Sequence, residues 1–275
     1  ELWELACVES VGEAGLSRQV RLKDGRTVDA LIVVAADGAH SGVAKQHGLA
    51  RRRTVYVATD WAVYAPPEIR ARWAGIMQLD MLRHPEVGYY WVFEKGDHLS
   101  VGVGTHHRHG SGIKARTREY LREQGLDGYP VHEQGWWVPL ARRGSRFINR
   151  RVLAVGDAAG LVDPGSGGGI GWGVWSGEVA AGAIHDFVYG TMPLEAYQRS
   201  MERVFLDRFE AAEALRNNIL VSVAMTGSPG HSLWPESTDV IAGGADYLRF
   251  KTAHRARYAL GRMWQRLAVR PVIER

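Results

Sequence analysis

Hydrophobic and polar residues alternate along several short stretches of the chain, and a period of two predicts β-strands. Near the start, residues 1–11 and 17–22 read as strands, and Asp24-Gly25 predicts a hairpin turn from 17–22 into residues 27–34. Further strands are predicted at 54–64, 75–82, 89–93 and 99–104, and a polar helix at 113–124. The middle of the chain therefore predicts an antiparallel sheet.

Two other stretches are continuously apolar and predict strands in the interior of a sheet. Residues 30–36 end at Asp37-Gly38, and residues 152–155 end at Gly156-Asp157. A carboxylate placed where an interior strand stops is well positioned to bind a ribose hydroxyl. Asp157 is therefore a candidate ligand-binding residue.

A glycine-rich loop follows the second of these strands. Residues 164–169 read Pro-Gly-Ser-Gly-Gly-Gly, so backbone N–H groups there can approach a ligand closely. Small residues then continue at helical spacing, at Gly171, Gly173, Ser176, Gly177, Ala180 and Ala181. The N-terminus of that helix would direct free N–H groups and a positive dipole end at a ligand. A tight structural loop without a ligand is the alternative, although glycine at this density is entropically costly.

These segments carry a family resemblance. ADGAHSGVAK, from Ala36, and VLAVGDAAGLVDP with GGGI, from Val152, resemble the two internal FAD motifs of the para-hydroxybenzoate-hydroxylase-like flavoproteins. The segment 89–104 resembles the YxWxFPK…VGxG signature of the geranylgeranyl reductase family. The matching residues are Tyr89, Trp91, Phe93, Lys95, Val101, Gly102 and Gly104, whereas Glu94 stands where the family has proline.

The resemblance implies the fold and the domain order. It implies an α/β fold, in which a Rossmann-like FAD-binding domain (1–53 and 146–190) is interrupted by a mainly antiparallel substrate domain (54–145) and followed by C-terminal helices (191–275). The chain begins with Glu1, and no GxGxxG motif follows a strand. We therefore expect an N-terminally truncated chain whose FAD-binding domain lacks one βαβ unit of about 30 residues.

The resemblance also implies site residues. Those expected to bind FAD are Asp37, Gly38, Gly156, Asp157, Ala158, Pro164, Gly167, Gly168, Gly169 and Ile170. Tyr89, Trp91, Phe93 and Lys95 alternate and so share one face of a strand, where they would line a prenyl groove. Packing of the same face on the core is the alternative. Tyr89 is a candidate proton donor, disfavoured by a solution pKa near ~10.

The activity implied is FAD-dependent saturation of C=C bonds in a prenyl substrate, which is a small molecule or an isoprenoid lipid. The electron donor is NAD(P)H or a ferredoxin, which the sequence does not distinguish, and the oligomeric state is likewise open. A flavin monooxygenase shares both FAD motifs and is the first alternative. A non-catalytic prenyl-lipid-binding module is the second, because no pyrophosphate-binding glycine motif is present.

Composition narrows these possibilities further. A single cysteine, Cys7, excludes an internal disulfide and argues against a cysteine-based metal site. We expect no metal, and a structural loop for the histidines at 106, 107 and 109. No zinc pattern or RNA-binding signature indicates nucleic acid. Arg51-Arg52-Arg53 is either a solvated loop or a contact for a cofactor phosphate.

The C-terminal part is predicted to be mostly helical. Residues 194–218 place Tyr197, Met201, Phe205 and Phe209 on one helix face. Residues 249–270 form a basic amphipathic segment, suited either to an anionic membrane surface or to packing on its own domain. No apolar run is long enough to cross a membrane, and no signal peptide is visible. We expect a cytoplasmic protein, with peripheral membrane contact as the open alternative.

Overall fold

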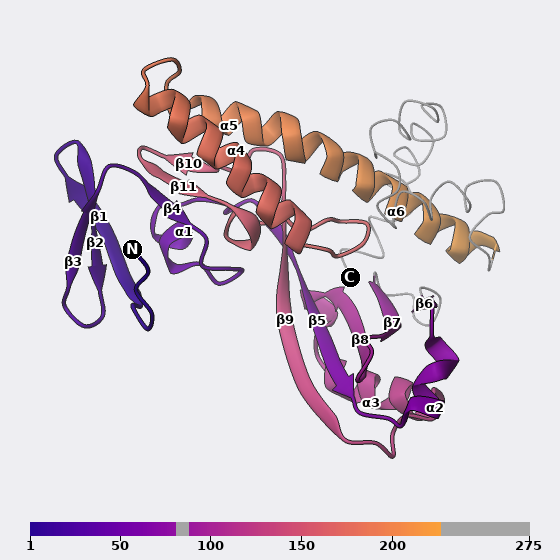
Figure 1. Ribbon diagram of the computed structural model, residues 1–275. Coiled ribbons are helices and arrows are strands. Elements are labelled where there is room, and N and C mark those ends of the chain that lie inside the picture. Colours follow the sequence, from indigo (N-terminus) through magenta and orange to yellow (C-terminus); the bar gives the residue numbers. More distant parts are fainter. Residues whose placement is uncertain (81–87, 227–275) are drawn as a thin grey trace. The chain divides into compact units, whose positions relative to one another are not determined.

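The structure is a computed structural model that describes residues 1–80 and 88–226 of the 275. These residues form two compact units, one of 1–54 with 139–216 and the other of 55–138 with 217–226 (Figure 1). The basic segment predicted at 249–270 and the end of the strand predicted at 75–82 lie outside the described residues.

The first unit begins with a three-stranded antiparallel sheet. Its strands are β1 (Val8–Ala14), β2 (Ser17–Leu22) and β3 (Thr27–Ala30), and they lie in that order. The hairpin at Asp24-Gly25 is confirmed, since β2 pairs with β3. The strand predicted at 1–11 is wrong over its first seven residues, where a turn places Leu5 at a φ of 56°. A side chain at positive φ cannot continue a strand.

A second sheet of the first unit contains the two predicted interior strands. Strand β4 (Val33–Ala35) pairs in parallel with β11 (Val152–Ala154), and β10 (Ile148–Asn149) pairs antiparallel with β11. The stretch predicted as one strand over 27–34 is therefore two strands in different sheets. The short helix α1 (Gly42–Gln46) follows β4.

Helices pack against this second sheet. Helix α4 (Ile170–Val188) is followed by α5 (Ala196–Met201), a π-helical segment (Glu202–Leu206) and α6 (Asp207–Thr226). The last three are continuous with one another, and α4 runs beside them in Figure 1. The predicted apolar helix face is confirmed. Its members are all buried in one core with the strands, namely Tyr197, Met201, Phe205 and Phe209.

The second unit is a five-stranded sheet in the order β6-β7-β8-β5-β9. The strands are β5 (Arg53–Val63), β6 (Met77–Asp80), β7 (Gly88–Glu94), β8 (Leu99–His106) and β9 (Val131–Ala141). Helix α3 (Ile113–Glu123) packs on one face, where Tyr120 and Leu121 join a core with Val92, Val101 and Trp61. A short helix α2 (Pro67–Arg70) and two 3-10 turns, Ala71–Trp73 and His107–His109, complete the unit.

The predicted fold class is confirmed. A parallel strand pair with helices forms one unit, an antiparallel sheet forms the other, and helices follow. The sequence did not predict β9 as a strand.

Candidate functional site

The two predicted aspartates lie at the same edge of the parallel sheet. Ala35 of β4 is paired with Ala154 of β11, and the N–H of Val155 donates to the carbonyl of Ala35 at 3.1 Å. Asp37 comes two residues after Ala35, and Asp157 comes two residues after Val155, so both stand beyond the carboxyl ends of parallel strands. Ligands of open α/β sheets bind at this edge.

Asp37 is engaged within its own turn. Its carboxylate accepts the hydroxyl of Ser41 and lies 3.4 Å from the N–H of Val43, in the first turn of α1. Ser41 in turn caps that helix by accepting the N–H of Ala44 at 2.8 Å. The structure thus gives Asp37 a role in holding the Asp37-Gly38 turn against α1. A ligand contact by Asp37 or Gly38 stays a prediction.

Asp157 differs from Asp37 because its carboxylate has no partner among the described residues. It lies half-buried in a 3-10 turn (Gly156–Ala159) that follows β11. Burial raises the pKa of this carboxyl group. A Cβ built on Gly169 would lie only 3.1 Å from Oδ1 of Asp157, so the glycine loop passes close to the acid. An unsatisfied, partly desolvated acceptor of this kind suits a hydroxyl donor from a ligand.

Asp163 organises the glycine loop (residues 164–169), although the sequence analysis did not identify it. Its buried carboxylate accepts the N–H groups of Gly165 at 2.7 Å and Ser166 at 2.8 Å. Its backbone bonds to the carbonyl of Gly168 at 2.9 Å and to the N–H of Gly167 at 2.8 Å, with Gly167 at a φ of 73°. An aspartate directly before Pro-Gly-Ser is the usual signal for such a turn.

The glycine loop leads into the N-terminus of α4. No side chain caps this helix at Gly169, so its first N–H groups, which include that of Ile170, have no intrahelical acceptor. Gly156 donates its N–H to the hydroxyl of Ser176 in α4 at 2.9 Å, which fixes the Asp157 turn on the helix. The remaining predicted residues divide by burial, since Ala158 and Pro164 are buried whereas Gly167, Gly168 and Ile170 are exposed.

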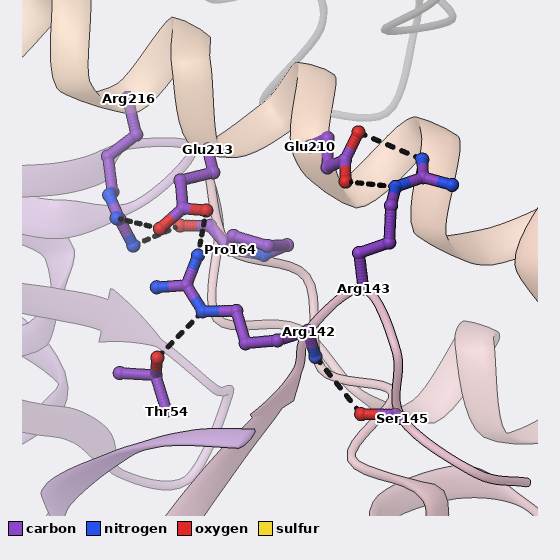
Figure 2. A network of polar contacts seen from close by, with 8 residues as sticks. All are labelled: Thr54, Arg142, Arg143, Ser145, Pro164, Glu210, Glu213 and Arg216. Carbon is purple, nitrogen blue, oxygen red and sulfur yellow. Dashed lines mark hydrogen bonds and ion pairs between the residues drawn. The ribbon is translucent and has the colours of Figure 1, made fainter. Parts of the chain in front are cut away.

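An ionic network anchors the loop to α6 (Figure 2). The guanidinium of Arg216 donates to the carbonyl of Pro164 at 3.0 Å and pairs with Glu213 at 3.2 Å. Glu213 also binds Arg142, whose Nε donates to the hydroxyl of Thr54 at 2.7 Å. Two contacts therefore fix the backbone of the loop: the Asp163 carboxylate binds its N–H groups, and Arg216 of α6 binds the Pro164 carbonyl.

In the second unit, the predicted aromatic residues share one sheet face. The ring centroids of Tyr89 and Trp91 lie 5.7 Å apart and those of Trp91 and Phe93 lie 6.3 Å apart. The ammonium of Lys95 lies 5.9 Å from the centroid of the Phe93 ring. The four side chains are thus neighbours, as their spacing predicts, and their role toward a substrate stays a prediction.

The glycines of the same signature lie beneath these rings. Trp91 is paired with Gly102 across β7 and β8, and a Cβ on Gly102 would come within 2.2 Å of the Trp91 ring. The indole N–H donates to Ser100 at 3.1 Å, and Ser100 donates to Asp60 at 2.6 Å. Glu94 accepts the N–H of Gly96 at 2.6 Å, so it stabilises the turn where the family has proline.

Two further findings concern only the described residues. Within 1–80 and 88–226, His, Cys, Asp and Glu side chains form no group of three or more that could hold a metal ion. In the same part of the chain, no helix combines the length and the apolar character needed to cross a membrane.

Comparison with known proteins gives the family. No family model matches the chain. It is 34% identical over 196 residues to digeranylgeranylglycerophospholipid reductase 1 of Methanopyrus kandleri, covering 67% of this chain and 52% of that protein. It is 32% identical over 162 residues to the chloroplastic geranylgeranyl diphosphate reductase of Arabidopsis thaliana, covering 58% of this chain and 34% of that one. The chain thus spans about half the length of the first relative and about a third of the second.

A solved structure supports the same fold. The geranylgeranyl bacteriochlorophyll reductase-like protein of Thermoplasma acidophilum superposes with a TM-score of 0.60 at 19% identity. The match covers 78% of this chain and 57% of that protein. Sequence relatives, fold and the residues of both signatures agree, and the chain therefore belongs to the geranylgeranyl reductase family.

Proposed function

We propose that this chain binds FAD at the Asp157 turn and the glycine loop, and takes part in reducing C=C bonds of a prenyl chain. The observation that carries the proposal is the half-buried Asp157 carboxylate, which has no partner in the part of the chain that the structure describes. It lies beside an open loop at the carboxyl end of two parallel strands. The names of the two relatives support a prenyl lipid or prenyl diphosphate as the substrate class.

The residues present fit FAD. Asp157 offers a desolvated acceptor to a ribose hydroxyl, and Gly167, Gly168 and Ile170 offer exposed backbone at the start of α4. Negative charge on a bound group is stabilised at an uncapped helix N-terminus. When bound in its reduced form, FAD supplies a hydride to one alkene carbon while a proton is added to the other. Asp37 and Gly38 would lie toward the ribose and pyrophosphate part.

The aromatic sheet face is proposed to bind the substrate. Tyr89, Trp91 and Phe93 offer apolar ring surface to a prenyl chain, and Lys95 offers a cation to a phosphate-bearing head group. The Trp91 ring is held by its hydrogen bond to Ser100, so it would act as a fixed wall. The proton comes from a protein group or from water, and Tyr89 is our candidate.

Flavin binding is the first test. The 275-residue chain is titrated with FAD while flavin fluorescence is followed, using wild type, Asp157→Asn and the control Asp29→Asn. Asp29 is an exposed aspartate of the same unit, so the control removes the same charge elsewhere. We expect Asp157→Asn to weaken FAD binding about tenfold or more, since a charged hydrogen bond is lost. Equal affinity of wild type and Asp157→Asn would contradict the site.

The reaction is tested separately, without oxygen. Chemically reduced FAD, the chain and a geranylgeranyl-bearing lipid are incubated, and the lipid mass is measured for the gain of H₂ per saturated bond. Oxygen uptake matched by insertion of oxygen into the lipid would instead select the monooxygenase. Lipid binding without any FAD binding would select the non-catalytic module.

A further inference from the structure

A second candidate site lies in the first unit, away from the glycine loop. A cavity of about 520 Å³ is bordered by the segments 46–52 and 144–149, and it includes none of the residues proposed to bind FAD. Its volume falls within the range of small-molecule sites. Its lining is mostly polar, so it suits a hydrophilic ligand and not a prenyl chain.

Three arginines give this basic pocket its charge. Arg51, Arg52 and Arg146 line it, and no aspartate or glutamate among the described residues does. Their exposed side chains form no ion pair and no hydrogen bond with any described residue. Most other arginines of this unit whose contacts are given have an acidic or carbonyl partner, as Arg142 and Arg143 do. Three unpaired guanidinium groups around one cavity favour an anionic ligand.

The backbone beneath the arginines is fixed by hydrogen bonds. The carbonyl of Arg52 accepts the hydroxyl of Ser145 at 2.6 Å, and the carbonyl of Arg146 accepts the N–H of Ala50 at 2.8 Å. The Arg52 side chain lies over Gly144, where a Cβ would come within 2.8 Å of Nη1. The pocket is therefore built from two chain segments that are tied together, and its charge does not depend on a freely moving loop.

The other polar side chains of the pocket are already engaged. Gln46 accepts the N–H of Val11 at 2.9 Å, and the His47 ring contacts the carbonyl of Val11 at 3.1 Å. Burial lowers the pKa of His47, which favours its neutral form. The amide of Asn149 donates to the carbonyl of His47 at 2.9 Å. Recognition of an anion thus falls to the guanidinium groups.

We propose that the basic pocket binds the diphosphate group of a hydrophilic ligand. A guanidinium group donates two parallel hydrogen bonds to phosphate oxygens, and three of them match a group with more than one phosphate. The diphosphate is shared by inorganic pyrophosphate and nucleoside diphosphates. The site is independent of the proposed flavin site and does not require it.

Calorimetric titration of the 275-residue chain with inorganic pyrophosphate at low ionic strength tests the proposal. The test variant is Arg51→Gln with Arg52→Gln, and the control is Lys23→Gln with Arg203→Gln, which removes the same charge from exposed positions outside the pocket. We expect the test variant to bind at least about tenfold more weakly and the control to bind like wild type. All four side chains are exposed, so the melting temperatures of the variants should stay unchanged.

Further titrations identify the source of the diphosphate. ADP binding more tightly than pyrophosphate would indicate a nucleotide, and equal binding would indicate recognition of the diphosphate alone. Pyrophosphate affinity should be the same with FAD present, whereas competition by FAD would overturn a separate site. Absent pyrophosphate and ADP binding, or equal weakening in test and control variants, would also overturn the proposal.

Discussion

Glycine is concentrated in two regions of this protein, and it serves a different purpose in each. In the glycine loop of the first unit, Gly167 and Gly168 are exposed and leave backbone open beside Asp157. In the second unit, Gly102 of β8 is covered by the Trp91 ring, and a Cβ there would also meet the carbonyl of Thr59 at 2.1 Å. The first region leaves room for something outside the chain, and the second is filled by the chain itself.

The difference shows how a glycine signature should be interpreted. Packing explains the first glycine of the VGxG part of the family signature, because Gly102 is paired with Trp91 across β7 and β8 and the Trp91 ring lies over it. Gly104 is paired with Tyr89, and a Cβ there would meet only the edge of the Trp91 ring, at 3.8 Å. Aromatic rings placed over strand glycines compensate for the missing side chain. The glycine loop has no such internal occupant among the described residues, and that contrast motivates the flavin site.

The largest effect that we expect comes from filling the packed glycine. Gly102→Ala would force the new methyl group into the Thr59 carbonyl and the Trp91 ring, and should lower the free energy of unfolding by about 3 kcal/mol or more. Gly104→Ala is the matched control on the same strand and face, since its nearest neighbour would be Trp91 Cζ3 at 3.8 Å. Urea unfolding of both variants measures the difference. Similar stabilities would show that Trp91 can move away from Gly102.

Loop anchoring should have the next largest effect. Arg216→Met removes the donor to Pro164 and one partner of Glu213, and should cost about 2 kcal/mol because the Arg216 side chain is only 12% exposed. It should also weaken FAD binding by loosening the glycine loop. The control is Arg143→Met, which removes another arginine that forms ion pairs with α6 (Figure 2). Its side chain is 54% exposed and its pairs with Glu210 and Asp207 should be worth less than about 1 kcal/mol.

Equal losses from Arg216→Met and Arg143→Met in thermal and urea unfolding would contradict this ranking. So would unchanged FAD affinity in Arg216→Met, because the Arg216 contact would then not determine the conformation of the loop. The carboxylates of Glu210 and Asp207 raise the pKa of Arg143, so its guanidinium group stays charged through the working range of such experiments.

The sequence predicted those parts of the fold in which the spacing of apolar residues matches the buried face of the strand or helix. Strands β5, β7 and β8 alternate between the α3 core and the opposite face, and the helix face at Tyr197 to Phe209 is buried in one core. Strand β9 was missed because its first seven residues are all exposed and carry no alternation. The split of 27–34 into β3 and β4 was missed because no glycine or proline separates the polar, exposed β3 from the apolar β4.

Residues of the candidate site were predictable where their sequence neighbours indicate the role. They were not predictable where the role depends on a partner that is distant in sequence. Asp157 and the glycine loop could be identified from neighbouring residues alone. Asp163 could have been identified in the same way, because an aspartate directly before Pro-Gly-Ser is a local turn signal. Arg216 lies 52 positions from Pro164, and only the folded chain brings the two together. The pocket at Arg51 and Arg52 could not be predicted either, because its other wall is formed by the segment 144–149.

A smaller effect is expected at the strand that leads into the Asp157 turn. Tyr197 is fully buried and donates its hydroxyl to the carbonyl of Ala154 at 2.7 Å. Tyr197→Phe keeps the ring and leaves that carbonyl without this donor, so it should lower the free energy of unfolding by about 1 kcal/mol. Burial also raises the pKa of Tyr197, so alkaline conditions should not ionise it before the protein unfolds. A tyrosinate absorbance appearing before unfolding would contradict the buried hydroxyl.

The smallest effect, of opposite sign, is expected at Asp157 and would sharpen the contrast between the two glycine regions. Burial raises its pKa above 3.8, so the folded protein holds the proton more tightly than the unfolded chain. The ionised acid therefore destabilises the flavin-free protein above the raised pKa, and this penalty disappears as the pH falls through 3.8. Asp157→Asn should melt about 2 °C higher than wild type near neutral pH, with the gap closing toward about pH 4. Saturating FAD should reverse the order, because it stabilises the wild type more. If the wild type were instead more stable than Asp157→Asn without FAD, the carboxylate would already have a partner within the protein. The opening beside the glycine loop would then be filled by the chain itself, as the space over Gly102 is.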